Sequence, residues 1–205
     1  MSGNNILLAS KDIKLKIDTN TGELIETKNN NGIVPFTNGP RPIGMKAKVE
    51  NVSIDQQKEY ASCVIKYSGG IDTIKWTLFN DGRLKMEMIV LKNGGNGNGF
   101  DGAFFEGEIN KFGITFDFPE EGVKAIKWLG NGPYRVWKNR IKGTTFGLWE
   151  KAYNNTITGE SFENLIYPEF KGYHANMIAA NLKTNNGDLN FFSESDKLFL
   201  RLFTP

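Results

Sequence analysis

The chain has 205 residues, of which 39% are hydrophobic and 12% aromatic, enough for one large all-β domain or two small ones with a sizeable core. Its 25 basic and 23 acidic side chains give a formal net charge of +2, so no electrostatic feature favours nucleic acid as a partner. No apolar run approaches the roughly 20 residues of a membrane span, and no membrane partner is expected. The single cysteine, Cys63, lies in an apolar run and is expected to be a buried structural thiol.

Alternating apolar and polar residues predict antiparallel strands in the first half of the chain. Residues 13–18 alternate with a period of two, and residues 24–27 return as the partner of a hairpin. Residues 80–82, Asn-Asp-Gly, predict a second hairpin, because Asp-Gly supplies the positive φ that such turns need. Residues 37–42 contain two prolines and are expected to be irregular. Further strands are expected over 45–54, 60–67, 71–79 and 84–90.

The second half of the chain shows the same pattern. Residues 93–102 are rich in glycine and asparagine, which predicts a loop or a seam between two halves of a sandwich. Residues 130–133, Gly-Asn-Gly-Pro, predict a sharp turn. Strands are expected over 112–118, 123–129, 141–149, 177–182, 189–192 and 198–203, the last of them central because it is apolar on both faces. About a dozen short strands and no amphipathic helix indicate an all-β fold, a large antiparallel two-sheet sandwich that fills residues 1–205 as a single domain.

Acidic residues are the groups that glycoside cleavage would need, as two carboxylates that flank the sugar bond. Glutamates at 106 and 108, 120 and 121, and 160 and 163 form close pairs, but none lies in an apolar setting that would raise a pKa. They are expected to be solvated surface groups, and no catalytic residue is assigned. The only histidine, His174, has no second ligand at a suitable spacing, so no metal and no cofactor is expected.

Aromatic side chains gather in the last third of the chain. Indole and phenol rings can stack on the apolar C–H faces of a sugar, and neighbouring polar side chains can bind its hydroxyls. The candidate carbohydrate-binding residues are Tyr134, Trp137, Arg140, Tyr173 and His174. A packing seam against the core or a neighbouring domain accounts for the same residues without a ligand, and both interpretations stay open.

Residues 128–133 read Trp-Leu-Gly-Asn-Gly-Pro and are followed by Arg140, Gly147 and Tyr153. This run resembles the W-L-G-x-G-P … R … G … Y signature of the C-terminal β-sandwich of β-galactosidase-like family 2 glycoside hydrolases. The resemblance extends over nearly the whole chain, and residues 76–84 are similar to the family's Y-x-x-Y-x-D-G-x-L hairpin. The family's Y-x-x-P-Q-E-N-G-x-R motif is replaced by a different sequence at 168–174, which indicates a divergent branch.

The resemblance implies a galactose mutarotase-like supersandwich that packs beside a (β/α)8 barrel. In the family, the catalytic glutamates belong to that preceding barrel, which is not in these residues. The chain is therefore interpreted as the C-terminal region of a longer glycoside hydrolase, an accessory domain that rims the active site and does not hydrolyse glycosides alone. Its expected partners are carbohydrate and the catalytic barrel domain of the parent chain.

Two other functions stay open. A stand-alone carbohydrate-binding module would present an exposed aromatic platform on one sheet. A mutarotase-type aldose epimerase would need His174 and a glutamate to face each other in a cleft.

Overall fold

The computed structural model describes residues 4–90, 113–154 and 172–202, so the loop predicted at 93–102 lies outside the described residues. The chain divides into two compact units, Met1–Phe118 and Pro119–Pro205, and each is described by itself. The prediction of an all-β fold is confirmed, because the described strands pair in antiparallel fashion. The one helical element among the described residues is the 3-10 turn η1 (Glu120–Gly122), and none of their helices is long and apolar enough to cross a membrane.

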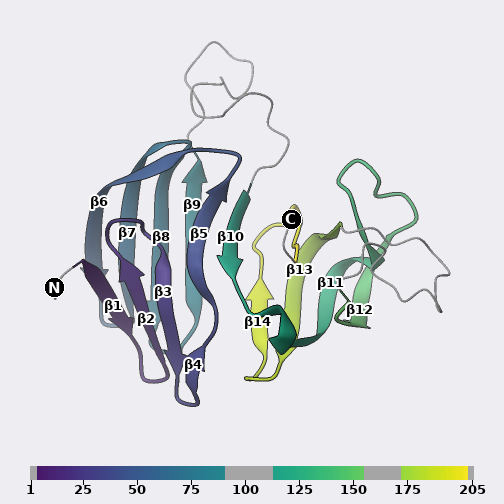
Figure 1. Cartoon of the computed structure of the whole chain (residues 1–205), viewed down its shortest axis with the longest axis horizontal. Helices are drawn as coiled ribbons and strands as arrows, with labels where there is room; N and C mark the ends of the chain where they lie inside the picture. Colours follow the sequence, from purple (N-terminus) through teal and green to yellow (C-terminus); the bar gives the residue numbers. More distant parts are fainter. Residues whose placement is uncertain (1–3, 91–112, 155–171, 203–205) are drawn as a thin grey trace, which may run out of the picture. The chain divides into compact units, whose positions relative to one another are not determined.

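The first sheet of unit 1 is built from hairpins (Figure 1). Its order is β1-β2-β3-β5-β10, and β4 pairs with β3. The strands are β1 (Asn5–Ala9), β2 (Ile13–Asp18), β3 (Leu24–Asn29), β4 (Gly32–Val34), β5 (Thr37–Ile43) and β10 (Gly113–Asp117). The predicted hairpin of β2 and β3 is confirmed, and Gly22 in its turn has the positive φ of 76° that favours glycine.

The second sheet of unit 1 is a four-stranded meander in the order β6-β7-β8-β9. The strands are β6 (Ala47–Gln56), β7 (Tyr60–Gly69), β8 (Ile71–Phe79) and β9 (Leu84–Val90). The predicted Asp-Gly hairpin joins β8 to β9, with Gly82 at φ 86°. Buried residues of both sheets, such as Leu15 and Trp76, form one hydrophobic cluster, so unit 1 is a two-sheet sandwich.

The expectation that residues 37–42 are irregular is wrong, because they form β5. Pro40 and Pro42 are two residues apart, so their missing N–H donors fall on the same edge of the strand. The opposite edge keeps the donors of Arg41 and Ile43, which lie opposite β10. The guanidinium of Arg41 also pairs with the carboxylate of Asp117 on β10. Strand pairing is therefore compatible with both prolines.

Unit 2 contains one sheet in the order β12-β11-β13-β14 (Figure 1). The strands are β11 (Val123–Val136), β12 (Thr145–Ala152), β13 (Tyr173–Thr184) and β14 (Leu189–Phe192). One face carries the core, in which Trp128, Met177 and Leu182 are buried. Strand β12 begins later than predicted, since Gly143 at φ 88° still belongs to the preceding turn.

The central strand predicted over 198–203 is not present among the described residues 198–202. Leu200 forms an isolated bridge with His174, and the carbonyl of Leu198 accepts the N–H of Met177 at 2.9 Å. Asn176 lies between these contacts with a positive φ of 50°, which interrupts a regular ladder. The segment instead packs Leu200 and Leu202 against the core of unit 2.

Candidate functional site

The sharp turn predicted at residues 130–133 is wrong, because β11 continues through them to Val136. Neither glycine has a positive φ; both make room for close neighbours. A Cβ on Gly130 would lie 3.0 Å from the carbonyl oxygen of Ala175 on β13, and one on Gly132 would lie 2.5 Å from Cδ1 of Trp149. The glycines of this motif therefore serve close packing within the sheet.

The tryptophans on either side of these glycines lie opposite each other on β11 and β12. The indole N–H of Trp128 donates to the carbonyl of Asn131 at 3.0 Å, and that of Trp149 donates to the carbonyl of Gly130 at 3.2 Å. Both indole donors are thus satisfied by carbonyl groups of the motif. The motif at 128–133 therefore serves to pack β11 against its neighbouring strands.

Two of the candidate residues, Trp137 and Tyr173, meet at the end of that strand. Val136 pairs with Tyr173, which brings Trp137 beside the tyrosine ring. The two ring centroids are 6.0 Å apart and the rings are inclined at 78°. Trp137 is 37% exposed and Tyr173 is half-buried. We call this pair the aromatic corner.

Sequence reasoning missed two neighbours of the aromatic corner. Phe199 packs edge-on against Tyr173 with centroids 6.2 Å apart, and the guanidinium carbon of Arg201 lies 5.7 Å from the centre of the same ring. Both residues lie in the segment 198–203 that was predicted as a strand. The arginine within this apolar run was the sequence signal that could have identified them.

Tyr134 and Arg140 belong to the same end of β11 and the loop that follows it. Arg140 is exposed, and its N–H donates to the carbonyl of Trp137 at 2.8 Å, which closes a turn. The hydroxyl of Tyr134 lies against Gly143, where a Cβ would be only 2.3 Å from the oxygen. Tyr134 therefore packs against the loop that carries Trp137 and Arg140.

The structure places His174 in the core of unit 2, apart from its neighbour Tyr173 at the surface. Its side chain is 5% exposed and packs on Trp128, with ring centroids 4.5 Å apart. Burial, together with the nearby charges of Arg135 and Lys151, lowers the pKa of His174 to about 3. The imidazole is therefore neutral near pH 7.

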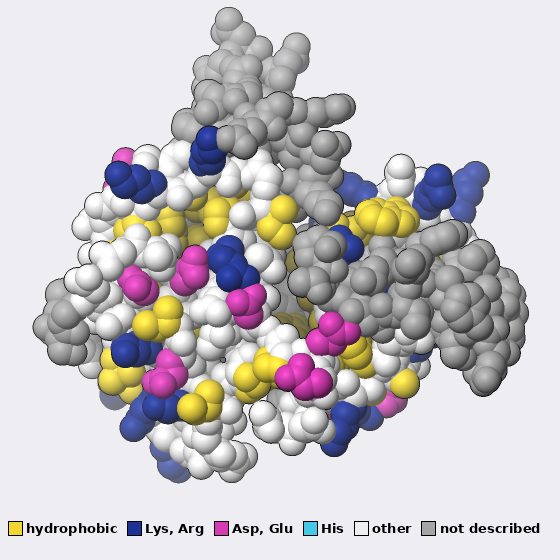
Figure 2. Space-filling model, viewed as in Figure 1, with side chains coloured by type: hydrophobic (Ala, Val, Ile, Leu, Met, Phe, Trp, Pro, Cys, Tyr) yellow, Lys and Arg dark blue, Asp and Glu magenta, His cyan; other side chains and the backbone are white. Residues whose placement is uncertain are grey.

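Acidic groups do not assemble into a centre in the part of the chain that the structure describes. No group of three or more His, Cys, Asp or Glu side chains there could hold a metal ion. Glu121 is exposed, and the predicted pairs at 106 and 108 and at 160 and 163 lie outside the described residues. Basic and acidic side chains are interspersed on the visible face of unit 1 (Figure 2).

A comparison with known protein families identifies the family of this chain. The family described as "Beta galactosidase small chain" matches residues 9–199, which covers nearly all of both units. The chain belongs to the β-galactosidase small-chain family. No match is found among curated proteins. The resemblance drawn from residues 128–133 is thereby confirmed at the level of the small-chain family.

Proposed function

We propose that this small-chain protein is the non-catalytic β-sandwich component of a β-galactosidase. In this proposal it associates with a larger chain that holds the general acid and the nucleophile, and it contributes the aromatic corner to the rim of the sugar site. The single β-sandwich domain expected for residues 1–205, as the C-terminal region of a longer glycoside hydrolase, stays a prediction. The family match supports the association, and the aromatic corner supports the contact with sugar.

The geometry of the aromatic corner favours a rim over a free-standing binding platform. Rings inclined at 78° form two walls, so one face of a sugar can stack on one ring while its edge contacts the other. A flat platform would need coplanar rings. The exposed guanidinium of Arg140, in the loop after Trp137, can donate to sugar hydroxyls.

The buried histidine weighs against the aldose epimerase alternative. A general acid or base works best with a pKa near the operating pH. Burial holds the pKa of His174 at about 3, so its imidazole cannot supply a proton near neutral pH. This supports a scaffold role for the described part of unit 2.

The open face of the sheet in unit 2 is a candidate surface for the larger chain. Cross-strand pairing aligns Leu148, Leu129, Ala179 and Phe192 in one row over all four strands. Leu148 is 64% exposed and Phe192 81% exposed, and Phe146 beside them is 58% exposed. Apolar groups gathered on one face are typical of a protein contact. We call this set the apolar row.

A Trp137→Ala variant tests the contact with sugar. In the assembled enzyme, loss of one stacking ring is expected to raise KM for nitrophenyl β-galactoside about 2- to 10-fold, because an aromatic contact is worth about 0.5–1.5 kcal/mol. Ile54→Ala removes an exposed apolar side chain on β6 of unit 1, outside both the aromatic corner and the apolar row, and should leave KM unchanged. An unaltered KM in Trp137→Ala would remove the aromatic corner from the sugar site.

A further inference from the structure

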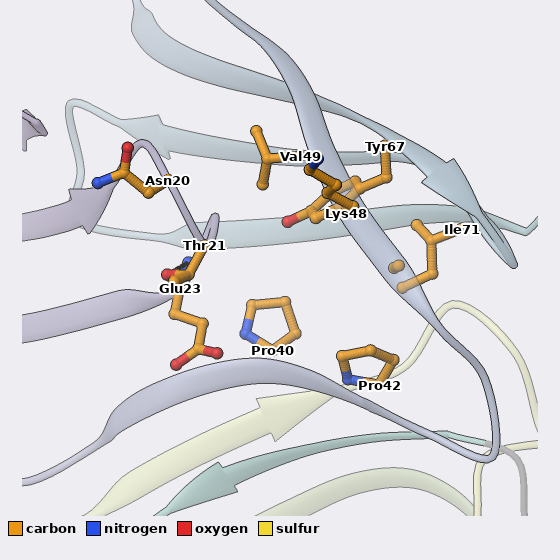
Figure 3. A pocket seen from close by; sticks show the side chains of 10 residues that line it. Asn20, Thr21, Glu23, Pro40, Pro42, Lys48, Val49, Tyr67 and Ile71 are labelled. Carbon is orange, nitrogen blue, oxygen red and sulfur yellow. Dashed lines mark hydrogen bonds between the residues drawn. The ribbon is translucent and has the colours of Figure 1, made fainter.

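Unit 1 contains a pocket of about 250 Å³ between the turn of β2 and β3 and strands β5, β6 and β7 (Figure 3). Asn20, Thr21 and Glu23 line it from the turn, while Pro40 and Pro42 line it from β5. A second pocket of about 580 Å³ adjoins it and shares Asn20, Lys48 and Val49. The two therefore form one continuous depression beside β6.

The hydroxyl of Tyr67 is an unpartnered polar group in this pocket. Tyr67 is only 7% exposed, and its hydroxyl oxygen is buried without a hydrogen-bond partner. Figure 3 shows that the hydroxyl points toward the turn that carries Asn20 and Thr21. Most buried polar groups in folded proteins are hydrogen-bonded, so an unsatisfied hydroxyl in a cavity indicates a missing partner.

The wall opposite Tyr67 is rigid. The N–H of Asn20 donates to the carboxylate of Asp18 at 2.6 Å, and the N–H of Gly22 donates to the carbonyl of Asp18 at 2.8 Å. A Cβ on Gly22 would lie 2.0 Å from the hydroxyl oxygen of Tyr67, so only glycine leaves room for that hydroxyl beside the turn. The turn and the tyrosine are thus pre-organised around the pocket.

The lining chemistry suits a neutral polyhydroxyl ligand. Hydrogen-bonding groups come from Tyr67, Asn20 and Glu23, and the ammonium of Lys48 balances the carboxylate of Glu23, so no single charge sign dominates. Proline and aliphatic side chains supply apolar surface for C–H groups. The volume falls just below the range of about 300–1,000 Å³ for drug-sized ligands, which matches one sugar ring.

We propose that this pocket binds a single pyranose unit, with the Tyr67 hydroxyl bonded to a sugar hydroxyl and the rest of the saccharide lying in the adjoining depression. The site is in unit 1 and is independent of the aromatic corner in unit 2. It is therefore a second carbohydrate site, beyond the proposed function.

The test is an NMR titration of the ¹⁵N-labelled full chain with lactose. Amide signals of residues 18–23 and 46–49 are expected to shift with a saturable dependence on lactose. Tyr67→Phe should weaken lactose binding about 3- to 10-fold, since one neutral hydrogen bond is lost, without lowering thermal stability in the absence of sugar. Tyr60→Phe is the matched control on β7, because the Tyr60 hydroxyl contacts Asp55 and does not line the pocket.

A second variant blocks the pocket from its exposed rim. Asn20→Trp places a large ring between the two pockets and should abolish the lactose-induced shifts of unit 1 while the spectrum stays folded. The proposal is overturned if lactose shifts no signals of unit 1, or if Tyr67→Phe binds lactose as tightly as the unaltered chain. Shifts confined to Trp137 and its neighbours would overturn the second site and leave the aromatic corner supported.

Discussion

The indole of Trp149 occupies the space that a side chain on Gly132 would need. A Cβ on Gly132 would lie 2.5 Å from Cδ1 of the ring, while the ring's N–H is held by the carbonyl of Gly130. Since Trp128 packs opposite Trp149 and against His174, this contact joins the glycines of the motif to the core of unit 2. Packing therefore leaves no room for a side chain at position 132.

Gly132→Ala is expected to destabilise the protein by about 1–3 kcal/mol, the usual range for overpacking, as measured by urea unfolding followed by tryptophan fluorescence. Gly147→Ala is the matched control, because a Cβ there would lie 3.4 Å from the same indole, at ordinary contact distance. Equal stability of the two variants would contradict the packing role of Gly132.

The burial of His174 is expected to make the stability of the protein depend on pH. The pKa of its imidazole falls from 6.5 in the unfolded chain to about 3 in the folded protein. As the pH falls, His174 is therefore protonated in the unfolded chain before it is protonated in the folded protein. The contribution is fully present above pH 6.5 and is lost as pH falls toward 3. Between pH 7 and 5 this loss amounts to about 2 kcal/mol.

The measurement is the free energy of unfolding in urea at both pH values for the unaltered chain and for His174→Gln. The variant removes the titrating group, so its stability should change less between pH 7 and 5. A histidine NMR signal that titrates near pH 6.5 in the folded protein would refute the burial of a neutral imidazole.

Several elements were predictable because their signals are local. Alternation in β2 and β3 and the Asp-Gly turn before β9 are set by residues close in sequence. Residues 37–42 and 130–133 misled the prediction, because proline and glycine usually break strands. Here both segments are kept in strands by neighbours distant in sequence, β10 for the first and β12 for the second.

The candidate site, too, could be predicted only in part from the sequence. An aromatic region in the last third of the chain could be predicted from composition. The contact of Trp137 with Tyr173 could not, since it depends on the pairing of Val136 with Tyr173 across 37 positions. The alternation that points Tyr173 outward also points His174 into the core, which a lone histidine in a sequence does not reveal.

The predicted burial of Cys63 is confirmed, and its thiol is a probe of global unfolding. Its side chain is 0% exposed, and burial raises the pKa of the thiol to about 11. Alkylation by iodoacetamide at pH 8 is expected to be negligible in the folded protein and rapid in urea above the unfolding midpoint. Fast labelling without denaturant would contradict this burial.

The apolar row predicts which surface variants impair assembly. Leu148→Lys should weaken association with a β-galactosidase large chain about tenfold or more without unfolding the protein, since Leu148 is 64% exposed. Ile54→Lys is the control, because Ile54 is also exposed, on β6 of unit 1. Sedimentation velocity of the mixed chains measures the effect, and equal behaviour of both variants would exclude the apolar row as the contact.

The most direct test of the proposed function is the hydrolysis of nitrophenyl β-galactoside by the purified chain, alone and mixed with a β-galactosidase large chain. The account predicts no turnover by the chain alone and a clear gain in activity on mixing. Enzyme-like turnover by the chain alone, or no gain on mixing, would contradict it.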